Sequence, residues 1–147
     1  MAAAVVIDTN IALDLLVFDD PAVAPLRQAL QDGRLQWLCT ESMREEWRRV
    51  LDYPQIQRRL PAGSPARVAA ERGFDARVRL VPTAAKAPFT CKDADDQKFI
   101  DLAVAERATL LSKDAAVLCM ARRLQRLGVS VCRQWNPDLL PEPFSPD

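Results

Sequence analysis

The chain has 147 residues, 49% of them hydrophobic and 27% charged, so we expect a single domain with its own core. Its 20 acidic and 20 basic residues balance, and it contains no histidine, which excludes histidine-based triads, histidine general bases and histidine-bearing zinc sites. Four scattered glycines exclude a P-loop and a dinucleotide-binding fingerprint. An enzyme of this composition must depend mainly on carboxylates.

Five short apolar segments without polar alternation are predicted to be strands of a parallel sheet that is covered on both faces. In chain order they are Ala3–Ile7, Leu35–Thr40, Val78–Val81, Thr109–Ser112 and Val129–Cys132. Helical patterns lie between them at Asn10–Phe18, Pro21–Asp32, Glu41–Tyr53, Pro65–Phe74, Asp95–Arg107 and Ala115–Leu127, with a further helical turn at Gln55–Leu60. The alternation predicts a layered α/β domain over residues 1–135, followed by a Pro-rich tail over residues 136–147.

No apolar run approaches the roughly 20 residues that a membrane-spanning helix requires. The opening MAAAVVID lacks the basic segment of a signal peptide, so we expect a cytoplasmic protein without a membrane partner. The cysteines form no C-x-x-C pair and are interpreted as buried apolar residues: Cys39, Cys91, Cys119 and Cys132. Clusters such as Arg48-Arg49 leave two interpretations open, phosphate contacts or a solvated helix face.

Two carboxylates follow the ends of predicted parallel strands. Asp8 comes directly after the first strand, and Asp114 comes two residues after the strand that ends at Ser112. Because ligands of open α/β sheets bind outside the carboxyl ends of the strands, we expect both acids at one functional edge. The alternative is that Asp8 or Thr9 only caps the helix that follows.

The predicted helix from Glu41 to Tyr53 offers three glutamates, which its geometry separates. Its apolar stripe consists of Met43, Trp47, Val50 and Leu51. Glu46 lies at the border of this stripe and can face a cleft beside the core, whereas Glu41 and Glu45 point away. An ordinary ion pair of Glu46 with Arg48 or Arg49 is the open alternative.

The segment KDADDQKFIDLA places a further acid on the buried face of a helix. Asp96 is aligned with Phe99 and Ala103, while Asp101 falls on the far side. The competing interpretation makes Asp93 or Asp95 a helix cap and Asp96 a first-turn acid favoured by the helix dipole. That interpretation does not explain why an acid is aligned with the core, where it needs a partner such as a metal ion.

Asp8, Glu46, Asp96 and Asp114 together are four inward-facing or strand-end carboxylates in a chain without histidine. Oxygen ligands without nitrogen or sulfur favour Mg²⁺ or Mn²⁺. Such carboxylates would repel one another without cations, and sites of this kind commonly serve phosphodiester hydrolysis.

Four segments carry a resemblance to a known family: VVIDTNIALDLL, EEWRRVLDYP, KDADDQKFIDLA and ATLLSKDAAVL. In order and spacing they resemble the successive blocks of the PIN-domain family, and more narrowly the toxins of bacterial type II toxin–antitoxin systems. The resemblance runs from about Val5 to Cys132. It implies a three-layer α/β/α sandwich with a mainly parallel sheet of four to five strands, and a Mg²⁺- or Mn²⁺-dependent ribonuclease that dimerises and pairs with an antitoxin.

Matched by position, the resemblance makes Asp8, Glu46, Asp96 and Asp114 the catalytic, metal-binding acids. It adds Asp93 as an acid that contacts the metal indirectly, and small polar residues that support the site. These are Asn10 and Ser112, and we expect Thr9 or Asn10 to help start the first helix. Two positions depart from the family pattern. Lys113 stands where Gly is typical, to bind phosphate or to face solvent, and Trp47 stands where Leu is usual, a change that we expect the core to absorb.

The sequence therefore predicts a divalent-metal-dependent endoribonuclease, with Arg49 and Lys113 as candidate phosphate contacts and RNA as its substrate. A non-catalytic PIN-like module that binds RNA or protein is the alternative. A phosphatase of the HAD type is disfavoured, since its D-x-D motif would need an acid where Asn10 stands.

Overall fold

The computed structural model of the protein describes residues 2–137, so most of the predicted tail over residues 136–147 lies outside the described residues. Five strands form one sheet in the order β3-β2-β1-β4-β5, and every neighbouring pair is parallel. The strands are β1 (Ala3–Ile7), β2 (Leu35–Cys39), β3 (Val78–Leu80), β4 (Thr109–Leu111) and β5 (Val131–Cys132). The predicted parallel sheet of four to five strands is thereby confirmed, at five.

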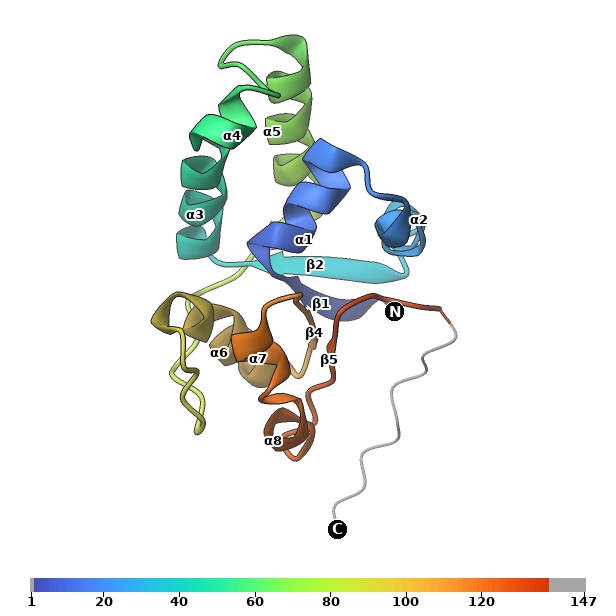
Figure 1. The fold of residues 1–147 in the computed structure, drawn as a ribbon. Coiled ribbons are helices and arrows are strands. Elements are labelled where there is room, and N and C mark those ends of the chain that lie inside the picture. Colours follow the sequence, from blue (N-terminus) through green and yellow to red (C-terminus); the bar gives the residue numbers. More distant parts are fainter. Residues whose placement is uncertain (1, 138–147) are drawn as a thin grey trace.

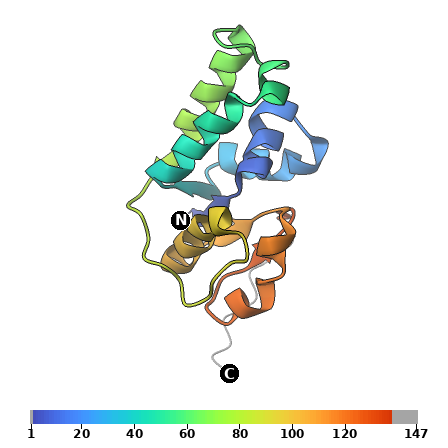
Figure 2. The ribbon, with the colours of Figure 1, turned by 60° about the vertical axis from the view of Figure 1, so that its left-hand side comes forward.

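Helices cover both faces of this sheet, which gives the expected three-layer α/β/α sandwich (Figures 1 and 2). One face carries the helices that precede β3: α1 (Thr9–Leu13), α2 (Ala24–Gln31), α3 (Glu41–Leu51), α4 (Pro54–Gln57) and α5 (Pro65–Arg77). The opposite face carries α6 (Gln97–Glu106), α7 (Ala115–Leu118) and α8 (Ala121–Gln125). Within the described residues, no helix is long and apolar enough to cross a membrane.

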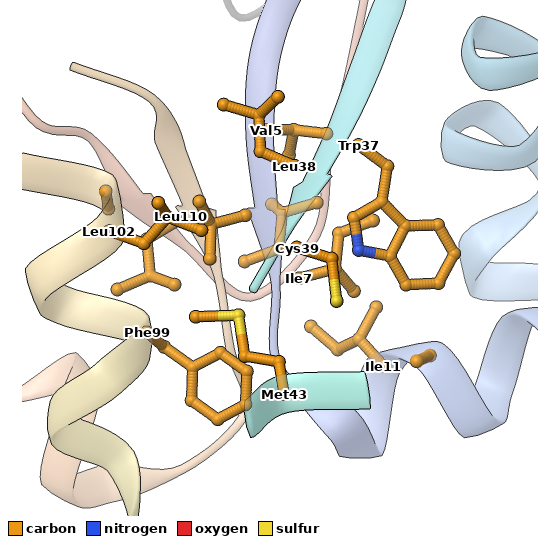
Figure 3. Close-up of a cluster of buried hydrophobic side chains, with 14 of the residues drawn as sticks. Val5, Ile7, Ile11, Trp37, Leu38, Cys39, Met43, Phe99, Leu102 and Leu110 are labelled. Atoms are coloured by element: carbon orange, nitrogen blue, oxygen red, sulfur yellow. The ribbon is translucent and has the colours of Figure 1, made fainter. Parts of the chain in front are cut away.

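The core lies on both sides of the central strands, as their unalternating apolar sequence predicts. Val5 and Val6 in β1 and Leu110 in β4 are fully buried. Figure 3 shows Met43 of α3 and Phe99 of α6 converging beside Ile7 of β1, which ties the two helical layers together near the end of that strand.

Trp47 packs in the hydrophobic core, as expected. It is 2% exposed and stacks on Phe74 of α5, with ring centroids 5.0 Å apart and planes 9° apart. Trp37 of β2 meets the same Phe74 ring edge-on at 5.2 Å. Aromatic pairs in these arrangements stabilise the folded state by more than their buried area alone provides. The three rings therefore help to hold α3 and α5 against the sheet.

Several predicted boundaries are wrong, and proline explains two of them. The helix predicted at Glu41–Tyr53 ends at Leu51, because Pro54 disfavours helical backbone at Tyr53, which is extended with ψ 141°. Pro54 then begins α4, one residue before the predicted turn at Gln55–Leu60. The helix predicted at Pro21–Asp32 begins as a 3-10 turn over Pro21–Val23, since Pro25 has no N–H to continue an α-helix from there.

The helix predicted at Ala115–Leu127 is wrong as one unit, because it breaks into α7 and α8. Both short helices contact β5, which has only two residues. A straight helix from Ala115 to Leu127 would be about 20 Å long. That is much longer than the two-residue strand β5 against which it would pack. The predicted helix Asn10–Phe18 is also divided, into α1 and a π-helical turn over Asp14–Phe18.

Six further elements differ from their predicted bounds by one to three residues. The helix expected to end at Phe74 continues to Arg77, since no breaker precedes β3. The helix expected at Asp95–Arg107 is a 3-10 turn over Ala94–Asp96 followed by α6. Strands β2, β3 and β4 end one residue early, and β5 starts two residues late. At β2 and β4 the residue that drops out, Thr40 or Ser112, uses its hydroxyl as a hydrogen-bond acceptor for the turn that follows.

The topology creates one special point at the carboxyl edge of the sheet. The chain runs outward from β1 through β2 to β3, then returns to place β4 on the other side of β1. Ligands of open α/β sheets bind where the strand order reverses in this way. The candidate site must therefore be sought beyond the ends of β1 and β4.

Candidate metal centre

Asp8 is the first residue after β1, and its carboxylate is buried at this reversal point, with 4% of the residue exposed. One oxygen, Oδ1, accepts the backbone N–H of Asn10 at 3.0 Å and so caps α1. The other, Oδ2, accepts the hydroxyl of Ser112 at 2.8 Å. Thr9 and Asn10 are the first two residues of α1, as expected, and of the two candidate caps Asp8 and Thr9 it is Asp8 that caps the helix, while it also faces the cleft described below.

Ser112 joins the two strand ends. Its fully buried hydroxyl donates to Asp8 and accepts the backbone N–H of Asp114 at 3.0 Å. Asp114 in turn caps α7 by accepting the N–H of Ala116 at 2.8 Å. The supporting role expected of Ser112 thus has a geometric basis, since one hydroxyl fixes the turn that carries the second acid against the first.

Asp96 and Asp93 join Asp114 in a compact acidic group. Within the described part of the chain, these are the three acids whose ligand oxygens all lie within 4.8 Å of one another. Asp93 is exposed and caps the 3-10 turn by accepting the N–H of Asp95 at 2.9 Å, as one of the alternative interpretations predicted. Asp96 is 8% exposed, and its buried Oδ2 has no hydrogen-bond partner among the residues described.

The pKa values of this site reflect buried, crowded carboxylates. Burial, together with the neighbouring Asp114 carboxyl, raises the pKa of Asp96 from 3.8 to about 7, with smaller contributions from Asp8 and Asp93. Burial also raises the pKa of Asp8, and its hydrogen bonds from Asn10 and Ser112 counteract part of that effect. The nearby charges of Glu46 and Asp114 raise the pKa of Asp8 further. A cation at this point would relieve the repulsion.

Glu46 of α3 faces the same acids but is held by other partners. The hydroxyl of Thr9 donates to its Oε2, and the ammonium of Lys98 on α6 lies 3.0 Å from its Oε1. The alternative that Glu46 pairs with Arg48 or Arg49 is wrong: its ion-pair partner comes from the opposite helical layer. Thr9 therefore supports the site through Glu46 rather than through the backbone of α1.

One open cleft of about 230 Å³ is lined by four of the predicted acids: Asp8, Glu46, Asp96 and Asp114. Its remaining wall comes from α1 and from the α3–α4 junction: Thr9, Asn10, Leu13, Val50, Tyr53, Gln55 and Ile56. Asp93 belongs to the acidic group but not to this lining.

The two predicted phosphate contacts differ in their surroundings. The ammonium of Lys113 pairs with the buried carboxylate of Asp14 at 2.5 Å, so it is not a free cation in solvent. Lys113 is also not among the residues that line the cleft. Arg49 is exposed on α3. It therefore remains available for an external anion, whereas Lys113 is already engaged.

Sequence reasoning missed the residues that hold Asp93 in place. Asp93 follows an irregular segment over residues 81–92. The side chains of Asp101 and Gln97 on α6 hold this segment by hydrogen bonds to its backbone. Asp101 accepts the N–H of Ala87 at 2.8 Å, and Gln97 accepts the N–H of Cys91 at 2.6 Å. The sequence signal for them was weak, because polar residues on the far side of a helix usually face solvent.

The donor set fits a hard divalent cation. It consists only of carboxylate oxygens, and one buried oxygen, on Asp96, has no protein partner. A buried anionic oxygen without a hydrogen bond is costly unless a proton or a cation satisfies it. Asp93, Asp96 and Asp114 are therefore the residues that could hold the ion, with Asp8 beside them.

Comparison with known proteins agrees with this geometry. A family model described as PIN domain matches residues 4–116, a range that contains every acid named above. No curated protein matches the chain.

Proposed function

The chain belongs to the PIN-domain family, and from this premise we propose that it is a divalent-metal-dependent endoribonuclease, the toxin of a toxin–antitoxin pair. PIN domains are generally nucleases that use divalent metal ions. The observation that carries the proposal is the unpartnered, buried Asp96 oxygen beside Asp93 and Asp114 at the reversal point of the sheet.

In this proposal Asp8, Asp93, Asp96 and Asp114 together hold the ion, which is Mg²⁺ or Mn²⁺. When bound, such an ion supplies Lewis-acid activation of water and neutralises charge on the phosphate. The chain's own residues set the geometry: Ser112 orients Asp8 toward Asp114, and Thr9 with Lys98 fixes the carboxylate of Glu46. A cleft lined by acids repels RNA, so exposed cations such as Arg49 are needed to hold the phosphates beside it.

The biological role follows the resemblance of the four sequence segments to toxins. We propose that the protein acts in the cytoplasm as a homodimer, and that a cognate antitoxin masks the acidic cleft. Induced expression should stop growth, and Asp8→Asn should restore it. Light scattering of the purified chain measures the oligomeric state.

The alternative, a non-catalytic module that binds RNA or protein, is favoured by one observation. Asp8, Asp93 and Asp114 each cap a helical turn, and Glu46 is ion-paired with Lys98. These four acids thus have structural roles without a metal. Asp96 does not, because its Oδ2 has no partner in the described structure.

The deciding experiment is cleavage of labelled single-stranded RNAs and tRNAs with Mn²⁺, Mg²⁺ or EDTA. Asp8→Asn should abolish cleavage while preserving the fold, since asparagine keeps the capping oxygen. Asp20→Asn is the matched control, because Asp20 also caps a helical turn, by accepting the N–H of Ala22 at 2.9 Å, but does not line the cleft. Cleavage that persists in Asp8→Asn would refute the assignment. Absence of both cleavage and calorimetric Mn²⁺ binding would favour the binding module.

A further inference from the structure

The α3–α4 elbow, residues 53–55, lies on the wall of the cleft that carries no acid. Tyr53 lines this cleft although the residue is 50% exposed, and Gln55 beside it is exposed as well. Large exposed apolar or aromatic residues are few in the described structure: Phe18, Tyr53 and Leu80. Of these three, Tyr53 alone lines the acidic cleft.

The backbone holds Tyr53 rigidly in this position. Its N–H donates to the carbonyl of Val50 at 3.1 Å, and its own carbonyl accepts the N–H groups of Ile56 and Gln57, each at 2.9 Å. Pro54 fixes the next residue as the start of α4. A ligand that stacks on this ring therefore has little backbone entropy to overcome.

The elbow and the preceding helix turn also present polar groups without partners. Within residues 2–137, the side chains of Tyr53, Gln55 and Arg49 make no hydrogen bond, ion pair or ring contact. Arg49 follows Glu46 by three residues on α3, which places both on neighbouring turns of one side of the helix, although Arg49 does not line the cleft itself. Arg48, by contrast, falls on the opposite side. A planar ring and an amide thus line the acidic cleft, and an exposed arginine lies on the neighbouring turn of α3.

We propose that the elbow and the neighbouring turn of α3 bind one unpaired nucleotide: the base stacks on Tyr53, the Gln55 amide contacts the base edge and Arg49 contacts a phosphate. The inference rests on the proposed nuclease function and names the residues that would hold an unpaired nucleotide beside the acids. An exposed aromatic ring can stack on any unpaired base, whereas the bases of a duplex are already stacked on one another.

The test separates base stacking from phosphate attraction. Fluorescence anisotropy of a labelled single-stranded RNA is measured on the Asp8→Asn protein, so that binding is observed without cleavage. Adding Tyr53→Leu should weaken binding about 5- to 100-fold, and Tyr53→Phe should restore it. Leu80→Ala, at an exposed apolar residue outside the cleft, is the matched control and should have no effect.

Arg49 is tested through the salt dependence of the same binding. Arg49→Gln should lower the slope of log affinity against log salt by about 0.7, the value for one phosphate of a single strand. Arg48→Gln, the matched control on the opposite side of α3, should leave the slope unchanged.

The outcomes distinguish this inference from the proposed function. Metal-dependent cleavage together with unchanged binding by Tyr53→Leu would overturn the inference and leave the nuclease intact. Loss of binding without any cleavage would support the nucleotide site in a non-catalytic module. Equal losses on single-stranded and duplex RNA would also overturn it, and an arm with single-stranded DNA shows whether the ribose contributes.

A separate observation concerns two cysteines near the acidic group. The thiols of Cys91 and Cys119 both donate to the carbonyl oxygen of Ala116, at 3.5 and 3.3 Å. Two sulfurs bound to one oxygen at these distances are no more than about 7 Å apart. Cys119 is exposed, so the interpretation of all four cysteines as buried apolar residues is wrong for this one; Cys39 and Cys91 are buried, and Cys132 is half-buried.

We infer that a peroxide converts this pair into an intramolecular disulfide. Peroxide oxidises the exposed Cys119 thiol to a sulfenic acid with release of one water, and the Cys91 sulfur then displaces the hydroxyl as a second water. Each thiol loses its proton and one electron, and the peroxide takes up both electrons. The bond would tie the segment before Asp93 to α7, which Asp114 caps.

Thiol titration after treatment with hydrogen peroxide tests this inference. The four free thiols of the wild type should fall to two, and dithiothreitol should restore four. Cys119→Ser should keep all three of its thiols, while Cys132→Ser should still lose two. Peptide mass spectrometry should recover the Cys91–Cys119 link. Disulfides only between chains, or overoxidised Cys119 beside a reduced Cys91, would overturn the inference.

Discussion

Replacing Asp96 by asparagine should stabilise the metal-free protein at high pH, although it removes a proposed ligand. The carboxylate of Asp96 is buried among Asp93 and Asp114, and one of its oxygens has no partner. Asparagine has nearly the same shape, carries no charge and offers an N–H₂ group that can donate to the neighbouring carboxylates. The variant therefore removes repulsion without leaving a cavity.

The pKa gives the sign and size of this effect. Because the pKa of Asp96 is raised from 3.8 to about 7, the folded state binds more protons than the unfolded state between these values. Stability from this group is thus greatest below pH 3.8 and declines as the pH rises to 7. At about 1.4 kcal/mol per pH unit the decline has a ceiling near 4 kcal/mol. Since the cleft is open to solvent, we expect a gain of about 1–3 kcal/mol for the variant at pH 8.

Urea unfolding in EDTA at pH 4, 6 and 8, followed by tryptophan fluorescence, measures the free energy of unfolding. Asp96→Asn should exceed the wild type at pH 8 and approach it at pH 4. Asp95→Asn, at the exposed neighbouring acid, is the control and should change little at any pH. Adding Mn²⁺ should stabilise the wild type more than Asp96→Asn. A variant destabilised equally at all three pH values, or stabilised by Mn²⁺ as much as the wild type, would refute the reasoning.

Two further substitutions test the framework around the site. Ser112→Ala should cost about 1–3 kcal/mol of unfolding free energy, because it leaves Asp8 Oδ2 and the Asp114 N–H without their partner. The loss should be larger at pH 8 than at pH 4, because the hydrogen bond from Ser112 favours the ionised form of Asp8 and lowers its pKa. Urea unfolding midpoints that shift equally at the two pH values would contradict this reasoning. Arg67→Met should also cost about 1–3 kcal/mol, because the buried guanidinium binds the Leu51 carbonyl at 3.0 Å and the Asp52 and Glu71 carboxylates, each at 2.8 Å. Arg72→Met, at an exposed arginine of the same helix, is its control, and similar thermal midpoints for the two variants would argue against a structural role for Arg67.

The acids at the strand ends could be located from the sequence because parallel strands always place their carboxyl ends at the same edge of the sheet. Asp8 and Asp114 follow short apolar strands, and parallel strands bring their carboxyl ends to one edge. Asp96 was found through helix periodicity, which aligns it with Phe99 on the buried face. Boundaries were less accurate where a terminal residue serves the next element: Ser112, expected in the strand, uses its hydroxyl to join Asp8 to the turn of Asp114.

The sequence by itself determined the parallel α/β class, the carboxylate character of the site and the four acids that line the cleft, since these depend on composition and on local periodicity. Only the tertiary structure decided which groups meet. Lys98 rather than an arginine of the same helix pairs with Glu46, and Lys113 is held by Asp14. It also placed Asp93, which the family resemblance had already named, directly in the acidic group, and it placed Tyr53 on the wall of the cleft. Such contacts join residues up to 99 positions apart. They are set by how the layers pack across the sheet, which no local pattern along the chain records.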